Sequence, residues 1–173
     1  MPITGGTLAD LGRDLRARLS PKRGPANCGL LVSPRGALWI GTPYDPFPAG
    51  QFLVESQELL PDGADIGRVI VTQAGGDHRW GTGMLPDAEI IPAREARGPV
   101  HRGPTPQRQH APVAGSGSST FLGAYPGRHF GAFDRSPTEV VRPTACLTGE
   151  LELTLGEYTV QVPSLPPAHT AGG

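Results

Sequence analysis

The chain has 173 residues, which is enough for one domain with a buried core, and nothing in it indicates a second domain. Its 15 basic and 16 acidic residues nearly cancel, so no long-range field favours nucleic acid or an anionic membrane surface as a partner. Only two cysteines, no apolar signal segment and no membrane-length apolar run favour a soluble, cytoplasmic protein.

The first predicted element is an amphipathic helix within residues 1–23. Thr7 and Asp10 match a capping box, and the helix is expected to end near Ser20–Pro21. The apolar residues at helical spacing are Leu8, Leu11, Leu15 and Leu19. We therefore separate an N-terminal helix and linker from a domain that covers residues 24–173.

The next residues predict the start of an α/β layer. Apolar runs at residues 28–32 and 37–40 are joined by a turn sequence at 33–36, which is typical of a β-hairpin. Residues 52–60 have apolar positions at helical spacing. Residues 68–72 are short and rich in β-branched side chains, which predicts a buried strand.

Periodicity is lost between residues 98 and 131, where glycine, proline and serine are frequent. This composition is typical of a disordered insert. Alternation of apolar and polar residues returns at 151–155 and 158–162, on either side of Gly156–Glu157. This pattern predicts a hairpin with one apolar face.

The strongest functional signal is the segment from Thr72 to His78, TQAGGDH, which follows the predicted strand. It resembles the zinc-binding loop T-H-x-H-x-D-H of the metallo-β-lactamase-fold hydrolases. Residues 79–81 and 85–91 resemble the "WGN…PDAEII" continuation found in many bacterial members. Residues 167–172 resemble the next metal motif, P-x-H-T-x-G.

This resemblance implies a set of ligand positions. The first zinc site corresponds to Gln73, Gly75 and His169, and the second corresponds to Asp77 and His78. Gln73 offers a neutral amide and Gly75 has no side chain, so both positions are degenerate. The resemblance therefore leaves Asp77, His78 and His169 as metal ligands, with Asp77 also in a catalytic position, and implies weak or absent zinc occupancy.

The remaining ligands of the family lie C-terminal to the P-x-H-T motif. The resemblance thus implies an α/β fold that is a partial αββα sandwich, truncated so that its C-terminal part is missing. Gly41 also stands where relatives carry an Asp that supports the metal loop. We expect strand faces that include Val69, Val71, Leu153 and Val160 to be incompletely covered, which favours self-association.

Two kinds of function remain open. The resemblance implies zinc-dependent hydrolysis of a small-molecule ester, thioester, lactone or amide, impaired by the two degenerate positions. The alternative is a non-catalytic remnant or a binding or oligomerisation module, because activity depends on the site and not on the fold. Cys28 opens an apolar strand and is expected to be a packed residue and not a nucleophile.

Overall fold

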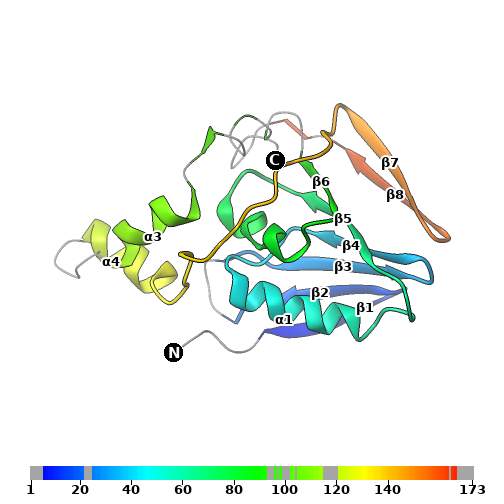
Figure 1. The fold of residues 1–173 in the computed structure, drawn as a ribbon, viewed down its shortest axis with the longest axis horizontal. Helices are drawn as coiled ribbons and strands as arrows, with labels where there is room; N and C mark the ends of the chain where they lie inside the picture. Colours follow the sequence, from blue (N-terminus) through cyan, green and yellow to red (C-terminus); the bar gives the residue numbers. More distant parts are fainter. Residues whose placement is uncertain are drawn as a thin grey trace.

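A six-stranded mixed sheet forms the centre of the protein in the computed structural model (Figure 1). The structure describes residues 6–21, 25–92, 96, 98, 102–103, 105–114, 121–163 and 165–166. In spatial order the strands are β1 (Thr7–Gly12), β2 (Leu15–Leu19), β3 (Cys28–Ser33), β4 (Gly36–Ile40), β5 (Ile66–Val71) and β6 (Glu89–Pro92). Neighbours are antiparallel from β1 to β4 and parallel from β4 to β6.

Helix α1 (Pro46–Gln57) covers one face of this sheet. Phe52 stacks on Trp39 of β4 with ring centroids 4.5 Å apart, and the Trp39 indole donates to Ser56 Oγ at 3.0 Å. The helix begins six residues earlier than residues 52–60 predicted, because Asp45 caps it by accepting from the Phe47 N–H at 2.9 Å. Prolines are tolerated in the first helical turn, where the N–H has no partner within the helix.

The hairpin of β7 (Glu150–Leu155) and β8 (Tyr158–Pro163) packs on the other face of the sheet. This confirms the hairpin predicted from alternation. Leu153 is 9 % exposed, and Val69 and Val71 on the α1 face are 0 % and 2 % exposed. The expectation that these three residues are incompletely covered is therefore wrong, because α1 and the hairpin bury both faces at this point.

The predicted N-terminal helix is also wrong. Residues 7–19 form the hairpin β1–β2, and β2 pairs with β3. Arg13 and Asp14 have φ values of 49° and 62°, so they form a two-residue turn that the right-handed twist of a hairpin favours. The leucine spacing fits a helix locally, but pairing with β3 satisfies the backbone of β2 and decides the structure.

Two helices lie in the segment that was predicted to be disordered. They are α3 (Pro106–Ala114) and α4 (Phe121–Phe130), so the prediction of irregular structure is wrong for these residues. Gln107 donates to the Thr138 carbonyl at 2.7 Å, and Phe130 packs beside Tyr44. A proline at the first position starts α3, and contacts with distant residues support both helices. Among the described helices, none has the length and apolarity needed to cross a membrane.

Candidate functional site

The loop that contains the sequence motif leaves the C-terminal end of β5 and turns back toward β4. It forms the short 3₁₀ helices η1 (Gly76–His78) and η2 (Trp80–Met84). Thr42, just after β4, donates its N–H to the His78 carbonyl at 3.0 Å and accepts from the Gly81 N–H at 3.0 Å. The loop therefore lies at the carboxyl ends of parallel strands, where α/β proteins commonly bind ligands.

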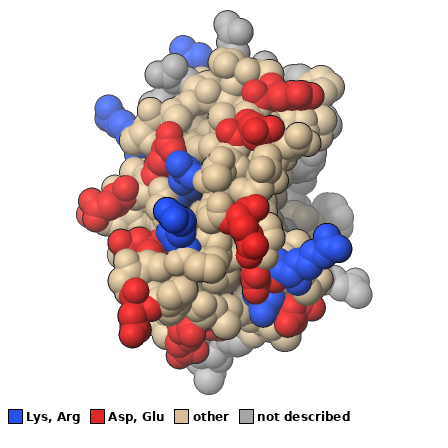
Figure 2. Space-filling view, turned by 90° about the vertical axis from the view of Figure 1, so that its right-hand side faces the viewer, with Lys and Arg blue, Asp and Glu red and all other residues tan. Residues whose placement is uncertain are grey.

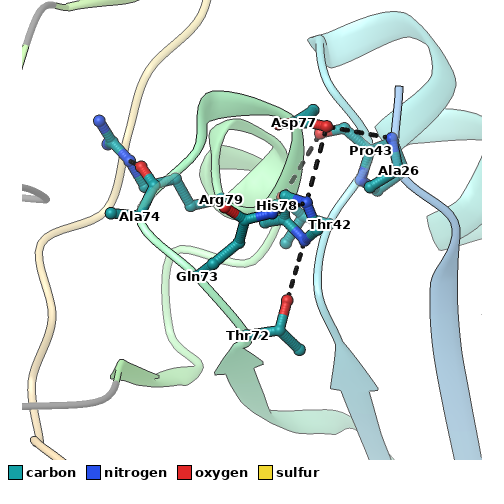
Figure 3. Close-up of polar contacts among 9 residues, drawn as sticks. All are labelled: Ala26, Thr42, Pro43, Thr72, Gln73, Ala74, Asp77, His78 and Arg79. Carbon is teal, nitrogen blue, oxygen red and sulfur yellow. Dashed lines mark hydrogen bonds and ion pairs between the residues drawn. The ribbon is translucent and has the colours of Figure 1, made fainter. Parts of the chain in front are cut away.

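Both ring nitrogens of His78 have a partner (Figure 3). Thr72 Oγ1 lies 2.9 Å from Nδ1, and Gln73 Nε2 lies 2.6 Å from Nε2. An amide NH₂ group is a donor only, so a neutral His78 accepts at Nε2 and carries its proton on Nδ1. The Nδ1–H group then donates to Thr72.

The Asp77 carboxylate lies near the Nε2 atom of His78. Its Oδ2 lies 3.6 Å from His78 Nε2 and accepts from the Ala26 N–H at 3.2 Å. The side chains of Asp77 and His78 are 26 % and 18 % exposed, so both can be reached from solvent. Arg79 is buried, which lowers its pKa, and its Nε donates to the Ala74 carbonyl at 3.0 Å.

The two glycines that replace polar residues of the resembled family differ in their backbone. At Gly75 a Cβ atom would lie 2.9 Å from Asp77 Oδ1, 3.3 Å from Gln73 Oε1 and 3.5 Å from His78 Cδ2, so a side chain here would begin among these groups. Gly75 has φ −59°, which any residue can adopt. Gly41 has φ +70°, which makes any other residue strained.

No protein-family model and no curated protein matches this sequence. Solved structures do match it. A metallo-β-lactamase from Pontibacter korlensis superposes with a TM-score of 0.64 at 12 % identity over 97 % of this chain and 64 % of its own. A subclass B3 metallo-β-lactamase of Bradyrhizobium japonicum gives 0.62 at 15 % identity over 95 % and 53 %. The chain has part of the metallo-β-lactamase fold.

Relatives with this fold include a zinc protein. A metallo-β-lactamase from Pseudomonas aeruginosa in its mono-zinc form matches with a TM-score of 0.50 at 15 % identity, over 57 % of this chain and 46 % of its own. The present chain spans only about half to two thirds of the length of the first two matched structures. Both observations agree with the fold class predicted from the motif.

The side chains of the loop offer few of the ligands that zinc prefers, which are imidazole, thiolate and carboxylate groups. The structure brings Gln73, Gly75, Asp77 and His78 together, as the motif predicted, whereas His169 lies outside the described residues. Within the part of the chain that the structure describes, no three His, Cys, Asp or Glu side chains form a metal-binding group. Asp77 and His78 alone do not fit a closed zinc site.

The sequence did not predict which residues distant in the chain contact the loop, such as Ala26. Ala26 precedes Asp77 by 51 positions, so no local pattern could place its N–H beside that carboxylate. A small cavity of about 30 Å³ also opens beside Ala26 and Cys28. Burial raises the pKa of the Cys28 thiol to about 12, and the residue is 4 % exposed, which confirms that it is a packed cysteine.

Proposed function

We propose that this chain is a relative of zinc-dependent hydrolases in which hydrolysis is impaired. In such hydrolases the metal lowers the pKa of a bound water, which then attacks an ester, thioester, lactone or amide carbonyl. The metallo-β-lactamase fold and the position of the loop at the strand ends support the relationship. The donor set supports the impairment, because Gln73 and Gly75 supply neither imidazole nor carboxylate.

A single observation carries this proposal. The ring nitrogen of His78 that faces Asp77 accepts a hydrogen bond from the Gln73 amide, at 2.6 Å. A histidine ligand needs this lone pair for the metal. The Nε2 atom of His78, which a metal site would use as a ligand, is therefore occupied by a hydrogen bond within the loop.

The test is to restore the two missing histidines with Gln73→His and Gly75→His together. A side chain at residue 75 starts within 3.5 Å of Gln73, Asp77 and His78, and its backbone has an ordinary φ, so the new imidazole is directed at the pair. We expect the double variant to bind zinc at least tenfold more tightly than the wild type. Asp77 has to move slightly to admit the new Cβ atom, which is 2.9 Å from Oδ1.

The matched control adds two histidines on exposed strand positions, with Gln161→His and Gly67→His. It is expected to leave zinc affinity at the wild-type value. Hydrolysis of ester, thioester and β-lactam substrates by the wild type is expected to stay near background. Zinc-dependent turnover by the wild type, or equal zinc affinity for the wild type and the loop variant, would contradict the proposal.

A second candidate function is a module that binds another protein copy. The observation that favours it is the edge strand β1, on which Leu11 is 59 % exposed. Unpaired strand edges are templates for pairing with another chain.

A further inference from the structure

The spacing of Asp77 and His78 is that of two ligands of one small cation. Their facing atoms, Oδ2 and Nε2, are 3.6 Å apart. Two ligand atoms in a tetrahedral zinc site, each about 2.0–2.1 Å from the metal, lie about 3.4 Å from each other. The pair therefore keeps the geometry for a metal, although it lacks the further ligands.

Gln73 contacts the same ring nitrogen of His78 that lies near Asp77. Its Nε2 lies 2.6 Å from His78 Nε2, so its N–H hydrogen sits on the lone pair where a metal would bind at about 2.0–2.1 Å. The amide and a cation cannot both use this lone pair. Binding of a cation at His78 thus requires the Gln73 side chain to move away.

The loop also has its own supports, independent of any cation. Asp77 accepts from the Ala26 N–H at 3.2 Å, and the His78 carbonyl accepts from Thr42 at 3.0 Å. Arg79 donates to the Ala74 carbonyl at 3.0 Å. These bonds tie together the segment before β3, the segment after β4 and the loop after β5, so the loop is held in place by hydrogen bonds alone.

We propose that Gln73 is a blocking residue, which holds the loop closed through His78 and excludes a divalent cation from the Asp77–His78 pair. This deepens the proposed function and rests on it, because it names the side chain that lowers metal affinity. A blocking residue and a missing ligand predict different effects on zinc affinity when the Gln73 side chain is removed. If Gln73 were only a missing ligand, removing its side chain would leave zinc affinity unchanged; as a blocking residue, its removal raises affinity.

The experiment titrates Zn²⁺ alone into the full chain and compares the wild type with Gln73→Ala. We expect Gln73→Ala to bind zinc about three- to tenfold more tightly, the factor that corresponds to the net contribution of one hydrogen bond. Gln161→Ala, on the exposed side of β8, is the matched control and is expected to equal the wild type. Affinity of Gln73→Ala that is equal to or weaker than that of the wild type overturns the proposal.

Thermal melting in a chelator tests the closing role of Gln73 separately. Gln73→Ala is expected to melt a few degrees below the wild type, because the Gln73–His78 bond is lost. An unchanged melting temperature overturns this part of the proposal. If Gln73→Ala fails to fold, Gln73→Leu keeps a similar side-chain volume, removes the donor and adds no ligand atom, and it too is expected to bind zinc more tightly than the wild type.

The tautomer of His78 gives a readout on the unmodified protein. A Gln73 amide that donates to Nε2 requires the proton on Nδ1, so ¹⁵N NMR of the imidazole is expected to show the Nδ1–H form. The Nε2–H form would overturn the proposal. Two tightly held zinc ions in the wild type would overturn the proposed function, whereas a zinc-poor wild type with no gain in Gln73→Ala would overturn only the blocking role of Gln73.

Discussion

Asp45 is a buried carboxylate that holds the start of α1. It is 4 % exposed, and it accepts hydrogen bonds from the Phe47 N–H and from the backbone N–H of Asp134. Burial, which disfavours the ionised form, raises the pKa of this carboxyl from 3.8 to about 6, although the two hydrogen bonds oppose the shift. Asp45 therefore makes the stability of the fold depend on pH.

The pKa of Asp45 is higher in the folded than in the unfolded chain, so the folded chain binds more protons between pH 3.8 and about 6. The stability contributed by the protonated carboxyl is fully present below the unfolded value and is lost as pH rises to about 6. The free energy of unfolding is expected to fall by an amount on the order of 3 kcal/mol over this pH range, because the pKa of Asp45 rises from 3.8 to about 6. Asp45→Asn keeps a capping oxygen. Urea unfolding from pH 4 to 7 is expected to show this loss in the wild type relative to Asp45→Asn, and parallel pH profiles would refute it.

Much of the residue content of the candidate site could be predicted from the sequence. Gln73, Gly75, Asp77 and His78 are close in sequence, so a single loop motif places them together, as the structure has them. The Gln73–His78 hydrogen bond could not be predicted, because the motif describes metal ligands and not what replaces them. The roles of Asp77 and His78 in metal binding stay predictions.

Among the elements, the hairpin β1–β2 differs most from its prediction. Four leucines have helical spacing in the sequence, but they lie on two paired strands in the structure. Gly12 has φ +81°, a backbone conformation that interrupts a helix. The hairpins β3–β4 and β7–β8 were predicted correctly because their turns carry glycine and their strands alternate or are uniformly apolar. The hairpin depends on pairing of β2 with the later strand β3, and its turn also receives a distant contact, because Tyr158 of β8 donates to the Asp14 carboxylate at 2.6 Å.

The turn of this hairpin holds a strained arginine. Arg13 has φ 49°, in the left-handed region where Asn and Gly are favoured and other residues are penalised. We expect Arg13→Asn to raise the free energy of unfolding by about 0.5–1 kcal/mol, measured by urea denaturation. Arg13→Ala, which removes the same side chain without relieving the backbone, is the control and is expected to give no gain. Equal stability of the two variants would show that the turn is not strained.

The whole molecule has three layers of a larger fold: α1, the six-stranded sheet and the β7–β8 hairpin. The motif predicted this fold class, because the loop resembles the signature of metallo-β-lactamase-fold proteins, and the structural matches at 12–15 % identity confirm that the chain has part of this fold. The degree of burial could not be predicted in the same way. Coverage of each strand face depends on packing between distant segments, which a local pattern does not contain.

Self-association is expected from the surface of the molecule. The net charge is −1, and acidic and basic side chains are interspersed on the face shown in Figure 2, so repulsion between copies is weak. Strand β1 ends the sheet, and Leu11 and Leu19 on the first hairpin are 59 % and 41 % exposed. We expect concentration-dependent oligomers in light scattering with size exclusion, reduced in Leu11→Lys, which places a charge on the edge strand.

Leu59→Lys is the control for this experiment, because Leu59 is 40 % exposed but follows α1 and is not part of the edge strand. It is expected to associate like the wild type. A wild-type chain that stays monomeric at high concentration would contradict the expectation.

We propose that the loop after β5 resembles a metal-binding loop but does not hold a metal ion tightly. The most direct test is elemental analysis of zinc in the purified wild-type chain after extensive dialysis. The Gln73–His78 hydrogen bond and the missing donors at residues 73 and 75 predict less than one zinc ion per chain. One or more tightly retained zinc ions per chain would contradict this expectation.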